Sequence, residues 1–234
     1  MAMGMATVTA AAMGAAMTDA AALLRLHAWL SPAFPTGGFA YSAGLERAIA
    51  DGIVGDAPSL REWIAGLLVQ GSAWNDAVLF ALAWRAGDAA EIDRLAELAQ
   101  ALCGSHERHR ESLHQGRAFV DAAANWAQGG FPHAGDMPYC VAAGRACRSG
   151  GVALETALGV WLQAFASNQL QAAIRLSVTG QQGAAALLAG LEAVILQVAQ
   201  RAAAAGEDDL GGLAFIAEIA SMNHEIQGAR LFLS

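Results

Sequence analysis

Residues 154–176 read LETALGVWLQAFASNQLQAAIRL, and this stretch decides the fold. Its large or apolar side chains recur every three or four residues, at Leu154, Leu158, Trp161, Phe165, Gln169, Ala172 and Leu176. That spacing is the period of an α-helix, and nearly every face of this helix is apolar. A helix of this kind belongs in the interior of a domain, so we predict a central helix over about residues 152–178.

Residues 156–174 carry no charged side chain, which raises the question of a membrane span. The segment holds several polar side chains, namely Gln163, Ser167, Asn168, Gln169 and Gln171. Placing that many polar groups in hydrocarbon is too costly. We therefore predict a buried helix and no membrane association.

Helical stripes continue on both sides of this segment. A helix through Leu23 and Leu30 should stop before Pro32, because the residue preceding a proline resists helical dihedrals. The run Ser59-Leu-Arg-Glu62 has the spacing of a capping box and predicts a helix start. The acidic residues 207–209 favour the N-terminus of a last helix that runs to about Gln227.

The interior of the chain has one long loop, over residues 128–136, which follows a predicted long helix from about Ser105 to Ala127. Pro138 suits the first turn of the next helix. We find no alternating strand pattern and no repeat of 20–50 residues. The prediction is an all-α domain of about eight to ten helices, a bundle around the central helix. It spans residues 20–234, and residues 1–19 form a disordered or weakly ordered leader.

The composition favours a protein that works through its surface. Hydrophobic residues make up 56% of the 234 residues and charged residues only 15%, which is more apolar content than a core alone requires. The net charge of −8 disfavours nucleic acid, whose phosphates need basic clusters. Three cysteines do not form a disulfide framework, which is typical of a cytoplasmic chain.

All thirteen basic residues are arginine, which excludes every mechanism that needs a lysine. A phosphate-loop lysine and a Schiff-base lysine are both ruled out. The sequence also lacks dinucleotide-binding and nucleophile-elbow fingerprints. We therefore predict that the chain is not an enzyme.

Cys103, His106, His109 and His114 gather on one predicted helix, and nickel accepts both imidazole and thiolate ligands. Arginine and glutamate surround these histidines, as on a solvated helix face. No further ligand is evident elsewhere in the sequence, so we predict no metal site and no tightly bound cofactor.

Residues 31–46 read SPAFPTGGFAYSAGLE and interrupt the helical pattern. Two prolines fix the backbone, while Gly37 and Gly38 permit positive φ or the close approach of another chain. Phe34, Phe39 and Tyr41 add aromatic side chains. A shaped, aromatic-rich loop between two helices is typical of a docking site.

The last residues, 221–234, read SMNHEIQGARLFLS. His224, Gln227 and Leu231 would share one face if the helix persists. His224-Glu225 is half of a zincin motif without its second histidine, so a catalytic role has little support. An apolar chain end either folds back on the core or inserts into a partner's groove, and the residues alone favour neither.

Both segments resemble the terminal signatures of the urease accessory protein UreF family. That family has a Ser-Pro, a Pro-x-Gly-Gly-Phe/Tyr and a Ser followed by Glu near its start, and closes on Met-x-His-Glu-x-Gln-x-x-Arg-Leu-Phe. Ser105, Glu107, Glu111 and Gln115-Gly116 fall where the family has a Glu-rich helix. The tail departs from the pattern at Ile226, Gly228 and Leu233.

The resemblance implies a non-enzymatic assembly factor that forms a homodimer, binds UreD (also called UreH) and recruits the GTPase UreG. That complex delivers nickel to the urease apoenzyme, and the tail is implied as the docking element for UreD/UreH. The residues implied to bind partners are Pro35, Gly37, Gly38, Phe39, Tyr41, Ser42 and Glu46 in the loop, and Met222, His224, Glu225, Gln227, Arg230, Leu231 and Phe232 in the tail.

Two other functions remain as alternatives. A helical enzyme would need carboxylates or histidines that converge in a buried pocket. A carrier of an apolar small ligand would need a cavity between its helices.

Overall fold

The computed structural model describes residues 19–126 and 136–234. Within them the chain forms ten α-helices, three short 3₁₀ helices and no strand. The α-helices are α1 (Ala20–Trp29), α2 (Leu45–Ala50), α3 (Ala57–Gln70), α4 (Ser72–Arg85), α5 (Ala89–Ala101), α6 (His106–Ala123), α7 (Tyr139–Ser149), α8 (Leu154–Arg175), α9 (Gln181–Ala204) and α10 (Phe215–His224). The 3₁₀ helices are η1 (Gly38–Ala40), η2 (Ala124–Trp126) and η3 (Glu207–Asp209). The prediction of a single all-α domain is confirmed.

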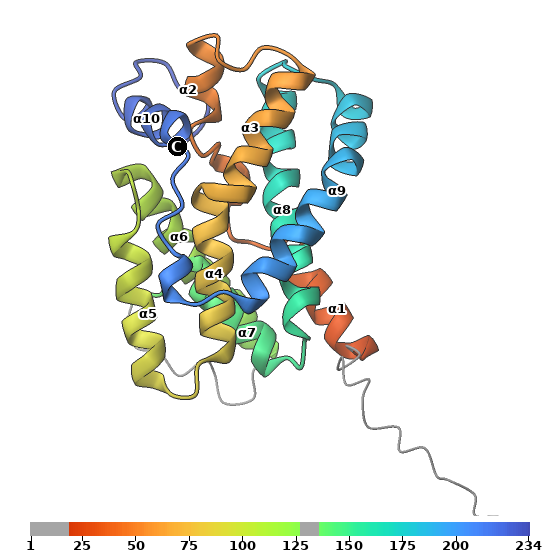
Figure 1. Cartoon of the computed structure of the whole chain (residues 1–234), viewed down its shortest axis with the longest axis vertical. Helices are drawn as coiled ribbons and strands as arrows, with labels where there is room; N and C mark the ends of the chain where they lie inside the picture. Colours follow the sequence, from red (N-terminus) through yellow and green to blue (C-terminus); the bar gives the residue numbers. More distant parts are fainter. Residues whose placement is uncertain (1–18, 127–135) are drawn as a thin grey trace, which may run out of the picture.

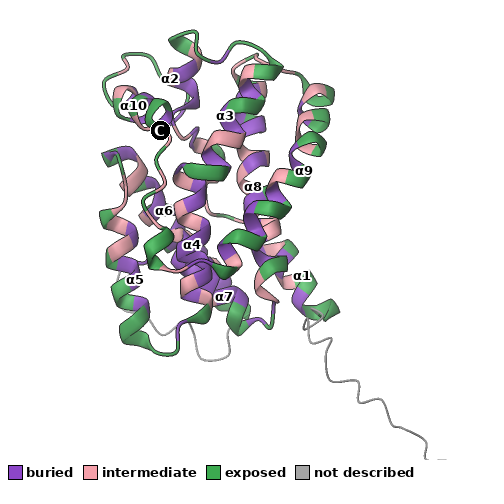
Figure 2. Cartoon of the chain, viewed as in Figure 1, coloured by how far each residue is buried: buried purple, intermediate pink, exposed green. Residues whose placement is uncertain are grey.

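Two helices form the centre of the bundle. The predicted central helix is α8, which packs against α2, α3, α4, α7 and α9, so its position is compatible with the prediction. The helix α4 has as central a place, because it contacts α3, α5, α7, α8 and α9 (Figure 1). Its Phe80 and Ala77 are fully buried, and Figure 2 shows buried residues concentrated on α4 and α7.

Small residues let α4 and α7 approach closely. A Cβ added at Gly144 of α7 would lie 2.4 Å from the carbonyl oxygen of Phe80, which no side chain can tolerate. Gly116 of α6 faces the Met137 carbonyl in the same way, at 1.9 Å. Close helix contacts therefore fix the position of α6, and the functional residues on α6 depend on that position.

The predicted N-cap of α3 is wrong by three residues. The helix begins at Ala57, and Asp56 is its N-cap, with a side chain that accepts a hydrogen bond from the Ser59 backbone N–H at 2.9 Å. Ser59 in turn accepts from the Asp56 N–H at 3.1 Å. The capping box is therefore Asp56–Ser59 and not Ser59–Glu62, because aspartate caps a helix as well as serine does.

The predicted start and end of the last helix are also wrong. The acidic residues 207–209 form η3, and an irregular segment separates η3 from α10. α10 ends at His224 rather than near Gln227. The N–H of Gln227 donates to the His224 carbonyl at 3.0 Å, which closes a turn in place of further helix.

The predicted position of Pro138 is also wrong. Pro138 is the N-cap of α7 and not part of its first turn. The predicted leader (residues 1–19) and the predicted loop (residues 128–136) lie outside the described residues, except for Asp19 and Asp136.

An aromatic cluster packs the start of the loop against the helices. The rings of Trp29 and Trp126 meet edge to face, with centroids 6.3 Å apart. Phe34 lies against Phe119 at 5.5 Å and against Trp126 at 6.0 Å. The entry to the loop at residues 31–44 is thus fixed between α1 and the end of α6.

One helix in the described part of the chain, α9, is long and apolar enough to cross a membrane by length and composition. Of its most apolar window, 28% is buried inside the structure. α9 packs along α8 and also contacts α3 and α4. A core helix passes the same test of length and composition, so this is weak evidence for a span.

Candidate functional site: a seam between the loop and the tail

The loop at residues 31–44 is held against α8 by two side chains. Arg175 donates to the carbonyl of Phe39 at 2.6 Å, and Asn168 donates to the carbonyl of Tyr41 at 3.2 Å. Gly37 adopts φ +74°, a left-handed conformation that favours glycine. Gly38 has no such need, since a Cβ added there would meet Gln115 at an ordinary 3.6 Å.

The tail, residues 225–234, folds back beside this loop. The N–H of Leu233 donates to the Ala40 carbonyl at 2.8 Å, and the N–H of Ser42 donates to the Ser234 carbonyl at 2.8 Å. The Ser42 hydroxyl bonds to the same carbonyl. Phe232 is only 3% exposed, and the Arg175 guanidinium stacks 4.2 Å from its ring centroid. The sequence left open whether the tail folds back on the core or inserts into a partner's groove, and in this structure it folds back.

Glu46 binds the tail through both of its carboxylate oxygens. Its Oε1 accepts the N–H of Leu231 at 2.7 Å, and its Oε2 accepts the N–H of Phe232 at 3.0 Å. The His224 Nε2 lies 3.1 Å from the same Oε2. Burial alone would raise the pKa of Glu46, but these hydrogen bonds to its ionised form outweigh burial and lower the pKa.

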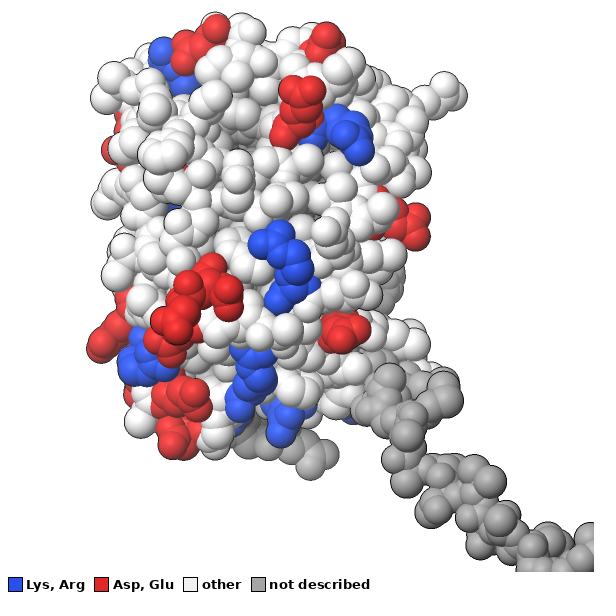
Figure 3. Space-filling model, viewed as in Figure 1, with Lys and Arg blue, Asp and Glu red and all other residues white. Residues whose placement is uncertain are grey.

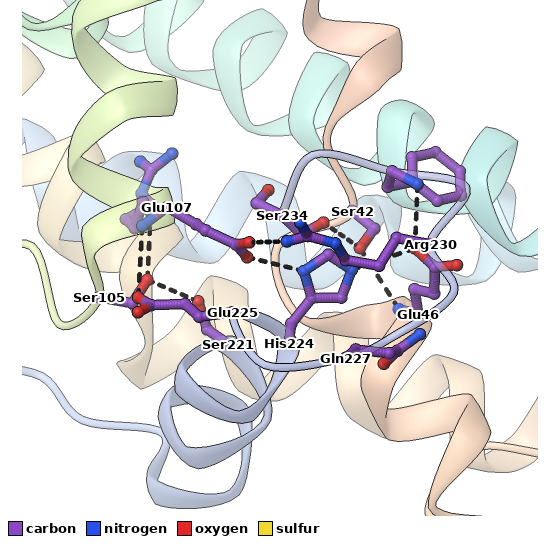
Figure 4. Close-up of polar contacts among 12 residues, drawn as sticks. Ser42, Glu46, Ser105, Glu107, Ser221, His224, Glu225, Gln227, Arg230 and Ser234 are labelled. Carbon is purple, nitrogen blue, oxygen red and sulfur yellow. Dashed lines mark hydrogen bonds and ion pairs between the residues drawn. The ribbon is translucent and has the colours of Figure 1, made fainter.

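His224 lies between two carboxylates and has no exposed surface (Figure 4). Its Nδ1 faces Oε2 of Glu107 at 2.7 Å, while its Nε2 faces Glu46. The ring can donate to both only in its protonated form, which has two N–H groups. Arg230 donates to the other oxygen of Glu107 at 2.6 Å, so the Glu107 carboxylate is paired on both sides.

The start of α6 is tied to the end of α10. Ser105 is the N-cap of α6, and its hydroxyl lies 2.8 Å from the hydroxyl of Ser221. The Glu225 carboxylate accepts the backbone N–H of His106 at 2.7 Å. A carboxylate at a helix N-terminus satisfies free N–H groups and complements the helix dipole.

A third buried carboxylate, Glu111, borders the seam, by which we mean the polar network of Ser42, Glu46, Glu107, His224, Arg230 and Ser234. Glu111 accepts a hydrogen bond from Gln115 at 2.8 Å and contacts the Ser234 hydroxyl at 3.3 Å. Burial raises its pKa, and the neighbouring Arg108 guanidinium only partly offsets that effect. Arg108 also pairs with Asp76 of α4, which links the seam to the centre of the bundle.

Apolar side chains surround this polar seam. On the loop and tail, Phe39 is 72% exposed and Leu231 52%. The outer face of α10 adds a larger group of exposed side chains, namely Phe215, Ile216, Ile219, Met222 and, just beyond the helix, Ile226. On the face shown in Figure 3, charged side chains are few and scattered over the upper part, near α10 and α2, and denser toward the lower end.

The structure brings several of the predicted residues into one site. Ser42, Glu46, His224, Arg230 and Phe232 meet in the seam, and Glu225 joins it at α6. The Tyr41 hydroxyl lies 3.3 Å from His114 Nδ1. Pro35 and Met222 are exposed, and Gln227 bonds to the Ala229 carbonyl at 3.0 Å. The shared face of His224, Gln227 and Leu231 does not form, because α10 ends at His224.

The predicted site residues omit Glu107, a central carboxylate of the seam, and three residues that position the loop and α10. Gly44 has φ +80°, and a Cβ there would lie 2.9 Å from the Ser221 backbone nitrogen, so it sets the contact between α2 and α10. Asn168 and Arg175 hold the loop from α8. Polar side chains on an otherwise apolar helix were the available signal for Asn168 and Arg175.

The histidine helix does not bring metal ligands together. Among the residues described, no group of three or more His, Cys, Asp and Glu side chains could hold a metal ion. Burial raises the pKa of Cys103 to about 11, so it is a thiol near neutral pH, and its Sγ bonds to the Ala99 carbonyl. A metal ligand would need the thiolate.

The fold and the seam define an all-helical protein with a buried polar network at its surface: the seam carboxylates are held in structural hydrogen bonds, and apolar side chains face outward around them. The UreF family model matches residues 54–192. The urease accessory protein UreF of Mesorhizobium japonicum is 53% identical over 226 residues, 93% of this chain and 100% of that protein. The UreF proteins of Brucella ovis and Rhizobium leguminosarum bv. trifolii are each 52% identical, over 91% of this chain and 94% and 96% of their own lengths.

The chain belongs to the urease accessory protein UreF family. Its role is therefore in urease maturation, together with other maturation factors.

Proposed function

We propose that this chain binds UreD/UreH through the seam and the apolar side chains around it, and recruits the GTPase UreG. In this proposal the assembly delivers nickel to the urease apoenzyme, and nickel is cargo rather than a resident cofactor. The chain works as a homodimer in the cytoplasm and makes or breaks no covalent bond.

The observation that carries this proposal is the convergence of three segments far apart in sequence. The loop, the start of α6 and the tail meet in one buried polar network, and that network fixes the backbone beneath Phe39 and Leu231. Exposed apolar side chains on a rigid support lose little conformational entropy when a partner binds. Such a surface is suited to protein docking.

The alternatives have less support in the structure. The seam carboxylates Glu46 and Glu107 are occupied by backbone N–H groups, Arg230 and His224, so neither is free to act as a general base. One surface cavity, between the loop, α6 and the tail, has a volume of about 270 Å³. Another, between α10 and the residues that follow α2, has a volume of about 300 Å³. Ligand pockets are usually larger and bury most of their ligand.

The test is a matched pair of single substitutions. Phe39→Ser removes an aromatic side chain that is 72% exposed on the loop, and Leu24→Ser removes an aliphatic side chain that is 71% exposed on α1. We expect Phe39→Ser to weaken binding to the UreD/UreH protein of the same genome by about tenfold or more, as the loss of an aromatic interface residue does. Leu24→Ser should leave the affinity unchanged.

Biolayer interferometry with purified proteins measures both affinities, and circular dichroism confirms equal helix content. Equal affinity of both variants and the unsubstituted chain would place UreD/UreH on another surface.

A further inference from the structure

A small cavity opens at the seam where the loop, α6 and the tail meet. It has a volume of about 270 Å³ and is lined by Tyr41, Glu107, Arg110, Arg230, Phe232 and Leu233. The rings of Tyr41 and Phe232, each almost fully buried, contribute an aromatic wall. Leu233, 58% exposed, lies at its edge.

The charges of this cavity do not balance. Glu107 is paired with Arg230 and with His224, so its charge is already compensated. Arg110 makes no hydrogen bond or ion pair with any residue in the described parts of the chain, although its charge acts on the phenol of Tyr41. The cavity lining thus carries one guanidinium, that of the exposed Arg110, whose positive charge no carboxylate of the lining pairs with.

We propose that this cavity receives an acidic side chain, aspartate or glutamate, from the UreD/UreH partner, and that Arg110 pairs with it. This proposal rests on the proposed function. A guanidinium presents N–H donors in a planar fork that matches a carboxylate, and such pairs are favoured at interfaces. The apolar side chain of Leu233 at the edge of the cavity and the ring of Phe232 in its wall would help to exclude water from the pair.

Size and charge both favour a carboxylate side chain. A volume of about 270 Å³ lies below the usual range of small-molecule pockets, whereas a single side chain with part of its backbone fits. A phosphate group carries about −1.5 to −2 charges. The one unpaired guanidinium that lines the cavity, Arg110, balances the single charge of a carboxylate but not the larger charge of a phosphate.

The experiment compares three substitutions in the full chain. Arg110→Gln removes the charge, and Arg110→Glu reverses it. Arg61→Gln is the control, since Arg61 is an exposed arginine of α3 that does not line the cavity. We expect affinity for the UreD/UreH protein to fall about tenfold in Arg110→Gln and about a hundredfold or more in Arg110→Glu, with no change in Arg61→Gln.

Arg110→Gln should also reduce the dependence of the affinity on salt, because one charge pair is lost. A substitution of the partner's acidic residue by arginine should restore binding to Arg110→Glu, which would identify the occupant of the cavity. Thermal melts establish that each variant is folded.

The outcomes separate this inference from the proposed function. If Phe39→Ser weakens binding and both Arg110 variants bind normally, docking at the seam stands and the acidic contact is wrong. If none of these variants weakens binding, both are wrong. Displacement of the partner by inorganic phosphate, but not by acetate at equal ionic strength, would replace the carboxylate with a phosphoryl group and overturn the proposal.

Discussion

His224 is the residue that holds the two ends of the chain together. It bridges Glu46, from the loop side, and Glu107, at the start of α6, and it is fully buried. Without its ring each of the two buried carboxylates would lose a hydrogen-bond partner and would face the other carboxylate. Removing one partner of a buried charged group leaves the other uncompensated, which costs far more than the loss of a surface contact.

We expect His224→Ala to lower the free energy of unfolding by about 3 kcal/mol. The control is His27→Ala, which removes an exposed histidine of α1 and should change stability by about 0.5 kcal/mol or less. Urea unfolding followed by circular dichroism measures both values. Equal stabilities for the two variants would show that the His224 bridge is energetically neutral.

At the scale of elements, the contact between α2 and α10 sets the geometry of the site. The two helices meet at Gly44, the N-cap of α2, whose missing side chain lets the backbone of Ser221 approach. Ser221 and His224 both belong to α10, so a shift of α10 would move the bridge as well. The tail cannot be removed to test this geometry, because Phe232 is part of the core.

Gly44→Ala tests that contact. The added Cβ would lie 2.9 Å from the Ser221 nitrogen, and the φ of +80° is unfavourable for alanine. We therefore expect the free energy of unfolding to fall by about 2 kcal/mol or more. Gly66→Ala is the matched control in α3, where a Cβ meets no heavy atom within 4 Å. The free energy of unfolding of Gly66→Ala should rise by about 0.5–1 kcal/mol, since alanine favours a helix more than glycine does. If Gly44→Ala left the free energy of unfolding unchanged, α10 would be able to shift away from α2 without loss of stability.

At the scale of the whole molecule, two buried carboxylates give stability opposite dependences on pH. The pKa of Glu46 is lower in the folded chain, so its contribution is present above the ordinary value of 4.5 and is lost as pH falls through the lowered pKa. The pKa of Glu111 is raised by burial, so its contribution is present below 4.5 and is lost as pH rises through the raised pKa.

We therefore expect Glu46→Gln to reduce the loss of stability on the acid side, and Glu111→Gln to reduce the loss on the side of rising pH. Urea midpoints over a series of pH values measure both slopes. The amides of Leu231 and Phe232, which Glu46 binds, should lose hydrogen-exchange protection first on acidification. Parallel pH profiles for both variants and the unsubstituted chain would refute the assignment.

The helices could be predicted from the sequence, because apolar spacing is a local signal. The helix α8 follows from the spacing of neighbouring residues alone. The predicted ends of helices were less accurate, because more than one residue near an end can serve as the cap, as Asp56 and Ser59 can for α3. The seam itself could not be derived from local pattern, because Ser42 and Ser234 are 192 positions apart and meet only when the bundle closes.

The aromatic cluster at the entry to the loop has a practical consequence. Trp29, Trp126 and Phe34 pack edge to face or tilted within 6.3 Å, and Phe34 lies within the loop that carries the seam. Rings at such separations couple optically, so their near-ultraviolet circular dichroism depends on how Phe34 is seated. The chain thus contains its own label-free optical probe, with which the arrival of a partner at the loop can be followed in real time.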